Sequence, residues 1–212
     1  MNLIKILPEV VYPYSIAEMR RDYANTAFPA TITSAELPDE VKEVLPGVYP
    51  IFDKDTHYIV ETYAEDGGVY SQVYSIEEYS QEVLDSRLND AKVEVVENIN
   101  KHRDTLEQTI FVWNNKPFDS DPISTARILV SVKAAELDPS GFSTTWVLAD
   151  NTTTPLTGEE MIEVLQAFYA FGKQLHEHAG LLKYQVYTAQ DFATLRSIDI
   201  YNGWPDPWNL NT

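Results

Sequence analysis

The 212 residues are enough for one large domain or two small ones, and 44% hydrophobic with 23% charged residues is typical of a globular protein rather than a disordered one. A formal charge of −18 without any basic cluster argues against nucleic-acid and anionic-membrane partners, because both attract positive charge. The absence of cysteine excludes disulfides, thiolate zinc sites and a cysteine nucleophile.

The N-terminus at 1–8 is apolar but too short for a secretory signal, and no apolar run approaches the ~20 residues that span a bilayer. We therefore expect a protein that is made and folded in the cytoplasm. Alternation at Leu3, Lys5 and Leu7 indicates a short strand. The Tyr-Pro-Tyr sequence at 12–14 is expected to break it, because proline restricts the residue before it.

Two short helices are predicted next. Ser15 and Glu18 have the spacing of a capping box, which predicts a helix running to about Tyr23. Pro38 stands at a plausible first helical position, and a second short helix is expected to end before residues 46–47, which are Pro-Gly. That second helix would carry Val41, Val44 and Leu45.

A β unit follows. Residues 48–51 are one candidate strand, and 57–63 and 69–74 are two stronger ones, separated by a Glu-Asp-Gly-Gly turn at 65–68. Glycine between two runs of β-branched and aromatic residues is typical of a hairpin. Its tyrosines either pack across the strands or form an exposed contact face. The tyrosines concentrated here are Tyr49, Tyr58, Tyr63, Tyr70 and Tyr74.

One long helix is predicted from about 77 to 108, since apolar residues recur there at steps of three or four. At roughly 1.5 Å per residue such a helix reaches about 45 Å, so it must lie against something. It either packs on its own domains or associates with copies of itself. The recurring positions are Leu84, Leu88, Ala91, Val95, Ile99, His102 and Leu106.

The remainder predicts a compact α+β module. Residues 110–118 indicate either a hairpin or a strand followed by a turn, Asp121-Pro122 opens a helix, and 142–149 indicate a strand followed by a turn at 150–153. The helix after Asp121 should carry Ile123, Ala126, Leu129, Val130, Lys133, Ala134 and Leu137. A capping box at Thr157 and Glu160 opens a long helix, and Thr188 is expected to cap a last short one running through Ile198. The long helix should carry Met161, Ile162, Leu165, Phe168, Tyr169, Leu175, Ala179 and Leu182.

Residues able to carry chemistry are sparse. His176 and His178 are two positions apart on a predicted helix, so their rings face different sides and cannot share a metal. No Gly-x-Ser-x-Gly elbow and no phosphate-binding glycine loop is present in the sequence. We therefore expect no catalytic residue, no cofactor and no metal.

Aromatic residues are the candidates for partner contact. Trp113 and Trp146 lie on predicted strands and are expected in the core. Trp204 and Trp208 lie in an irregular tail, where they either pack back on the module or anchor a partner. The candidate contact residues are Tyr12, Tyr14, Tyr58, Tyr70, Trp204 and Trp208.

Two stretches resemble proteins of tailed bacteriophages. Residues 12–16, with Arg20 and the Asn-Thr-Ala-Phe-Pro sequence at 25–29, resemble the start of tail proteins encoded beside tail-fibre genes. A longer stretch is similar to an uncharacterised C-terminal domain family common in phage tail-fibre and fibre-assembly proteins. It comprises 98–104, 110–113, 118–121, 126–128, 146–151, the helix from 156, and 199–205, and leaves 206–212 unexplained.

The resemblance implies a non-enzymatic structural component of the virion tail, at or near the tail fibre or baseplate, with fibre or baseplate proteins as partners. An assembly chaperone for the fibre and a host-receptor-binding module are the alternatives. The expected organisation is an α/β docking domain at 1–75, a long connecting helix at 76–109 that could self-associate, an α+β module at 110–200 and an aromatic tail at 201–212.

Overall fold

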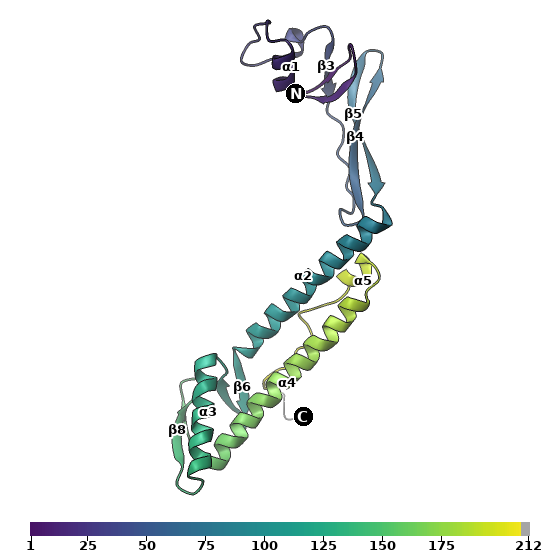
Figure 1. Ribbon diagram of the computed structural model, residues 1–212. Coiled ribbons are helices and arrows are strands. Elements are labelled where there is room, and N and C mark those ends of the chain that lie inside the picture. The colour runs from purple at the N-terminus through teal and green to yellow at the C-terminus, as the bar shows by residue number, and fades with distance from the viewer. Residues whose placement is uncertain (209–212) are drawn as a thin grey trace. The chain divides into compact units, whose positions relative to one another are not determined.

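A computed structural model describes residues 1–208 and confirms the predicted mixed α+β class (Figure 1). The chain divides into two compact units, Met1–Asp85 and a second one from Ser86 onward. This division differs from the predicted one, in which residues 76–109 stood apart as a connecting helix. Each unit has hydrophobic core clusters of its own.

The N-terminal unit is built on a five-stranded sheet of order β2-β1-β3-β5-β4. β1 (Asn2–Lys5) pairs antiparallel with β2 (Val11–Tyr14) on one side and with β3 (Val41–Leu45) on the other. Two predictions were therefore wrong: the Tyr-Pro-Tyr sequence at 12–14 lies within an edge strand, and the expected helix around Val41 is strand β3. Edge strands tolerate proline, and β-branched Val41 and Val44 are buried in the sheet.

Helix α1 (Ile16–Asp22) covers this sheet and confirms the predicted capping box. The Ser15 hydroxyl accepts from the backbone N–H of Glu18 at 3.1 Å, and the Glu18 carboxylate accepts from the backbone N–H of Ser15 at 2.8 Å. Met19 faces inward and joins Leu3 in the core of the unit. The only helical turn between α1 and β3 is the short 3-10 helix η1 (Ser34–Glu36).

The predicted hairpin is confirmed and is longer than expected, with β4 (His57–Asp66) antiparallel to β5 (Val69–Glu78) over ten residue pairs. Gly67 and Gly68 have positive φ at its turn, a conformation that glycine adopts without a side-chain clash. The candidate strand at 48–51 is not a strand; Val48 and Ile51 are 92% and 100% exposed. β5 runs to Glu78, so the long helix begins only at Gln81.

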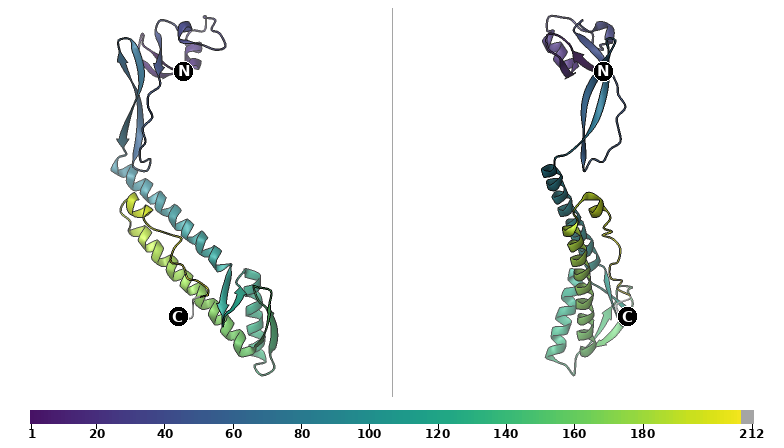
Figure 2. Two further views of the ribbon diagram at one scale, coloured as in Figure 1. Left: turned by 180° about the vertical axis from the view of Figure 1, so that it is seen from behind. Right: turned by 90° about the vertical axis from the view of Figure 1, so that its right-hand side faces the viewer.

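In the C-terminal unit, α2 (Gln81–Glu107) and α4 (Gly158–Thr188) lie side by side and antiparallel (Figure 2). The Lys92 ammonium donates to the Tyr187 carbonyl at 3.3 Å near one end, and His176 Nε2 lies 2.7 Å from Glu107 Oε1 near the other. Leu88 and Ile99 of α2 pack in a core cluster with Ala179, Leu182 and Val186 of α4 and with Phe192 and Leu195 of α5 (Phe192–Arg196). The predicted apolar side of the long helix is thus covered within the chain.

The rest of this unit consists of two hairpins and α3 (Pro122–Leu137), around a core that includes Phe111, Phe118 and Phe171. β6 (Ile110–Trp113) and β7 (Lys116–Asp119) form the first hairpin, as predicted, with Asn114 and Asn115 both at positive φ. β8 (Ser143–Val147) and β9 (Thr153–Thr157) form the second. The strand at β9 was not predicted.

Helix ends in this unit follow local sequence. Asp121 caps α3 and Thr157 with Glu160 caps α4, both as predicted. The last helix, α5 (Phe192–Arg196), is capped by Asp191 and not by Thr188, which lies inside α4. Across residues 1–208, no helix is long and apolar enough to cross a membrane.

Candidate partner-contact surfaces

The β4–β5 hairpin carries a row of tyrosine rings on one face, which we name the tyrosine ribbon: Tyr63, Tyr70 and Tyr74. In the strand register Tyr63 lies opposite Gln72, and Tyr74 opposite Glu61, so all of these side chains share that face. The ring centroids of Tyr63 and Tyr70 are 5.9 Å apart. Tyr12 of β2 stands edge-on to Tyr63 at 5.4 Å, and Tyr49 stands edge-on to Tyr74 at 5.2 Å.

Two polar groups beside the tyrosine ribbon form hydrogen bonds to the same carboxylate. The Tyr12 hydroxyl donates to Glu61, which also accepts from the Gln72 amide at 2.7 Å. Burial, reinforced by the hydrogen bond to Glu61, raises the pKa of Tyr12 to about 12, so the ring remains a neutral donor at physiological pH. Tyr12 and Tyr70, both predicted contact residues, are thus brought together around Tyr63.

The β4–β5 hairpin buries little of its surface. From Leu45 to Arg87 no residue is fully buried, although 20 of these residues are in β4 and β5. A two-stranded hairpin alone is only marginally stable in water, and a third strand or a covered face normally supports it. Here β3 pairs with β5 only at Val44–Tyr70 and Leu45–Ser71. The hairpin therefore offers rings and unpaired strand edges that a partner could cover.

Tyr58 lies on the opposite face of the hairpin from the ribbon. Its hydroxyl donates to Glu77 at 2.9 Å, and that hydrogen bond raises its pKa. Its ring lies 5.1 Å from that of Tyr79. Tyr58 is partly exposed and remains a candidate contact residue, but it cannot act on the same face as Tyr70.

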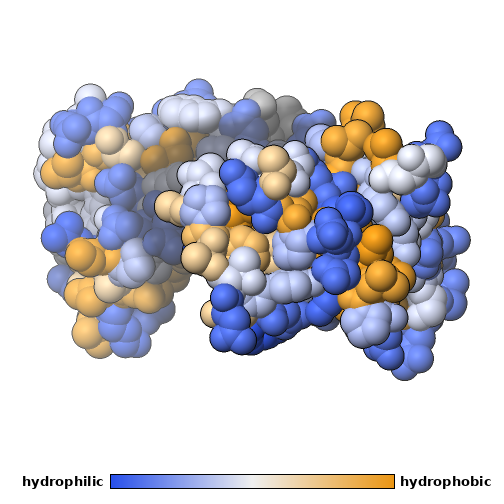
Figure 3. Space-filling model, turned by 90° about the horizontal axis from the view of Figure 1, so that it is seen from above, coloured by the Kyte–Doolittle hydropathy of each residue, from blue (hydrophilic) through white to orange (hydrophobic). Residues whose placement is uncertain are grey.

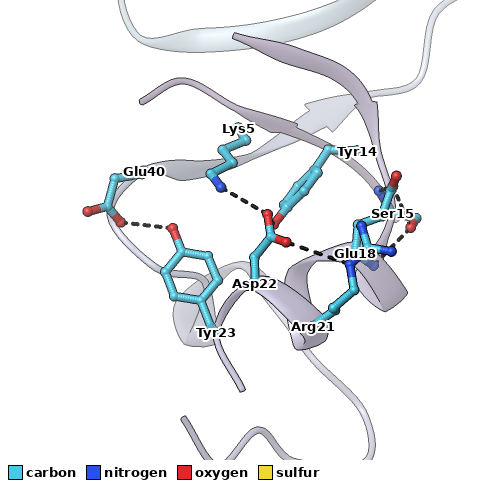
Figure 4. Close-up of polar contacts among 8 residues, drawn as sticks. All are labelled: Lys5, Tyr14, Ser15, Glu18, Arg21, Asp22, Tyr23 and Glu40. Carbon is cyan, nitrogen blue, oxygen red and sulfur yellow. Dashed lines mark hydrogen bonds and ion pairs between the residues drawn. The ribbon is translucent and has the colours of Figure 1, made fainter. Parts of the chain in front are cut away.

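Tyr14 is a core residue. It is only 4% exposed, and its hydroxyl donates to Asp22 at 3.0 Å (Figure 4). Lys5 donates to the same carboxylate at 2.9 Å, and Figure 4 shows both side chains pointing at Asp22 from the strands that α1 covers. The hydrogen bond from Lys5 comes first among the causes that lower the pKa of Asp22. This cluster fastens α1 to the sheet, and its position leaves Tyr14 out of any surface contact.

Of the two tail tryptophans, Trp204 packs back on its own unit. Its ring lies 5.2 Å from His102 of α2 and 4.7 Å from His178 of α4, and its Nε1 donates to the Ile200 carbonyl at 2.9 Å. Trp208 is 52% exposed and remains available to a partner. The rest of the predicted tail, 209–212, lies outside the described residues. Trp113 and Trp146 are partly buried and pack against the core, as predicted.

The residues that the sequence pattern picked out along α3 lie at the surface of the helix. Ile123, Val130 and Leu137 are 64%, 70% and 78% exposed, whereas Ile128, Val132 and Ala135 are buried. Beside the exposed face runs a groove of about 780 Å³, whose other wall is β8 from Thr144 to Val147. α4 likewise exposes Tyr169, Tyr184 and Tyr187. On the side shown in Figure 3, hydrophobic residues reach the surface in several groups between hydrophilic ones.

Carboxylates with a lowered pKa all perform structural tasks. In each case hydrogen bonds from a helix end, a turn or Lys5 stabilise the ionised form. These residues are Glu18, Asp22, Glu36, Asp121, Asp150, Glu160 and Asp191. Perturbed groups often mark catalytic sites, and here each perturbation has a local structural cause.

The paired histidines have separate surroundings. His176 lies against Glu107, whereas His178 packs on Trp204 and its Nε2 is 3.2 Å from the Asn202 carbonyl. Among the described residues, no three His, Asp or Glu side chains come together as metal ligands would.

The C-terminal unit is the part of the chain that comparison with known proteins identifies. Residues 90–201, from within α2 to just beyond α5, match the model of a family described as Domain of unknown function (DUF4376). No curated protein and no solved structure matches the chain significantly. Since the match covers more than half of the 212 residues, the chain belongs to the family described as Domain of unknown function (DUF4376).

Proposed function

We propose that this protein is a non-enzymatic structural component of a bacteriophage tail, at or near the tail fibre or baseplate. It would be made and folded in the host cytoplasm and then incorporated into the virion tail. The sequence resemblance described above supplies the setting. The structural observation that supports it is the β4–β5 hairpin, in which no residue is fully buried and whose tyrosine ribbon and strand edges are accessible to a partner.

The ribbon suits a protein partner for a physical reason. Tyrosine offers a large apolar ring with few rotatable bonds and a hydroxyl for hydrogen bonding, so it is favoured in protein interfaces. Tyr63, Tyr70 and Tyr74 are half-buried and already held against their neighbours, so binding would order little. The carboxylates on the same hairpin favour a partner with basic residues at the rim of the contact.

The first test is mass spectrometry of gradient-purified virions, with copy number measured against a known tail protein. A fixed copy number, as in a multiple of three or six, is the expected result. Absence from particles together with co-purification with the fibre from co-expressing cells would overturn the structural role in favour of a fibre-assembly chaperone. Binding of the isolated protein to host cells would instead favour a receptor-binding module.

A second test addresses the ribbon itself. The full chain is co-expressed with tagged fibre or baseplate protein, and recovery is compared between wild type, Tyr63→Ser/Tyr70→Ser and a control, Tyr184→Ser. Tyr184 is more exposed than either ribbon residue but lies on α4. We expect the ribbon variant to lose the partner and the control to retain it. Equal recovery of all three would contradict the role of the ribbon.

A further inference from the structure

We propose that two copies of this protein associate through the exposed face of α3, with the two α3 helices antiparallel and Val130 at the two-fold axis. The face consists of Ile123, Ala126, Val130, Ala134 and Leu137, which we name the α3 seam. All five residues are exposed. The proposal concerns this helix and not α2, and it does not depend on the tail function proposed above.

The seam has the pattern of a helix–helix interface. Ile123, Val130 and Leu137 recur every seven residues, and Ala126 and Ala134 fill the positions between them. Large apolar residues at heptad spacing with small neighbours allow two helices to approach closely. The opposite face of α3 is already occupied, because Ala135 faces the start of α4, where an added Cβ on Gly158 would lie 3.2 Å away. The seam therefore has no partner within the described chain.

The spacing is self-complementary. Ile123 and Leu137 each lie seven residues from Val130, and Ala126 and Ala134 each lie four residues from it. An antiparallel pair centred on Val130 therefore sets Ile123 of one copy against Leu137 of the other, and Ala126 against Ala134. An interface that uses one patch on both subunits needs this kind of internal match.

Lys133 borders the α3 seam and is compatible with the antiparallel arrangement. Its side chain is exposed at the border of the seam and ion-paired to Glu136 at 2.9 Å, and that contact raises its pKa, so it is charged. An antiparallel pair centred on Val130 places each Lys133 near Ala126 of the other copy, where a long side chain has room.

The charge of the chain explains why a second copy would use this helix. Two molecules of formal charge −18 repel each other over most of their surfaces. α3 contains Arg127 and Lys133 against Glu136 alone, so 2 − 1 gives +1. α2 has four basic and seven acidic residues, which gives −3, and α4 has two and four, which gives −2. Among the three long helices α3 alone permits close approach without acidic repulsion.

The groove beside the seam supplies additional contact area. A standard interface buries about 800 Å² per partner, which is more than three apolar side chains provide. The groove of about 780 Å³ extends the surface past Arg127 to Trp146 and Val147 of β8. Val147 is more than half exposed, and within residues 1–208 β8 pairs with β9 alone, which leaves its other edge open there. The second copy would cover the seam together with this groove.

The experiment is native mass spectrometry and sedimentation equilibrium on the full-length protein. Wild type should form a dimer of 2 × 24.1 = 48.2 kDa. Val130→Glu, which places two carboxylates at the two-fold axis, should weaken dimerisation roughly 100-fold or more. Leu181→Glu is the control, because Leu181 is similarly exposed but on α4. Circular dichroism verifies that each variant is folded. A monomeric wild type, or a dimer that survives Val130→Glu, would overturn the proposal.

The direction is tested by cross-linking, because the natural chain has no cysteine. Ile123→Cys and Leu137→Cys variants are prepared separately, mixed and oxidised. The antiparallel pair predicts a mixed disulfide between the two variants. A disulfide formed only within each single variant, joining identical positions, would show a parallel pair and refute the arrangement proposed here.

Discussion

The two units use aromatic residues in opposite ways. Nine of the 13 tyrosines lie in Met1–Asp85, whereas all four tryptophans and six of the eight phenylalanines lie beyond residue 85. In the C-terminal unit the rings of Phe111, Phe118 and Phe171 are buried in a core. In the N-terminal hairpin the tyrosines remain at the surface and contact one another across strands. One unit is therefore stabilised by burial, and the hairpin of the other by pairwise contacts that leave it open to partners.

The largest effect should come from the C-terminal core. Phe111→Ala removes a fully buried ring that stacks on Phe118 at 5.4 Å, and such truncations cost about 3–5 kcal/mol. Because every tryptophan belongs to this unit, urea unfolding followed by tryptophan fluorescence reports on it alone. Tyr187→Ala, an exposed residue of α4, is the control and should change stability by less than about 0.5 kcal/mol. A small loss of unfolding free energy for Phe111→Ala would contradict the view that burial of aromatic rings stabilises this unit.

The next largest loss of stability is expected where the β4–β5 hairpin meets the rest of the N-terminal sheet. A Cβ on Gly47 would lie 2.3 Å from the Gln72 carbonyl oxygen, so Gly47→Ala must displace backbone. Forcing atoms into a packed site costs about 1–3 kcal/mol. Hydrogen exchange of the β3 and β5 amides should accelerate in this variant. Gly172→Ala, where a Cβ meets nothing within 4 Å, should be neutral or slightly stabilising, and equal behaviour of the two variants would contradict the clash.

A smaller effect is expected in the ribbon. Tyr63→Ala removes ring contacts with Tyr12 and Tyr70, worth about 1 kcal/mol for cross-strand aromatic pairs. The measurement is hydrogen exchange of the β4 and β5 amides. Tyr63→Phe keeps the ring and should behave like wild type. If both variants lose the same protection, the hydroxyl and not the ring stabilises the hairpin.

The smallest effect is a pH dependence specific to the N-terminal unit. The pKa of Asp22 is below its ordinary value of 3.8, so its contribution to stability is complete above that pH and is lost as pH falls through the lower, folded value. The pKa of Lys5 is above 10.5, so its contribution is complete below that pH and is lost as pH rises through the higher value. Asp22→Asn should flatten the alkaline loss in melting curves followed by circular dichroism. The control variant Glu9→Gln, which changes an exposed residue of the same unit, should retain the loss of stability at alkaline pH.

Features set by near neighbours in the sequence could be predicted, and those set by distant contacts could not. Ser15 with Glu18 and Thr157 with Glu160 cap helices because each pair completes its own hydrogen bonds. β3 was predicted as a helix because its strand state depends on pairing with β1, about 40 residues earlier. α3 has apolar residues on nearly every side, so periodicity could not reveal that α4 covers Ile128 and Val132 and leaves Val130 exposed.

The candidate contact residues show the same limit. Tyr12 and Tyr14 are two positions apart on β2, a spacing that in a regular strand places both side chains on one face, yet Tyr12 contacts Tyr63 whereas Tyr14 is buried beside Asp22. One ring reaches the ribbon and the other enters the core, and the sequence alone did not distinguish them. Trp204 differs from Trp208 because His102 and His178 happen to flank its ring. The exposed tyrosines of α4 carried a helical spacing that could have been recognised once the buried face was known.

The antiparallel pairing of α2 with α4 has a consequence for synthesis. Leu88 and Ile99 pack on residues from Ala179 to Leu195, which are synthesised roughly 80–107 residues later, a delay on the order of 10 s at typical elongation rates. The hairpin needs only a local closure, which takes about 1–10 μs. In a nascent chain the tyrosine ribbon is therefore formed and exposed for seconds before α4 and α5 bury the apolar side of α2. Any factor that recognises the ribbon could bind during translation, before the C-terminal unit exists.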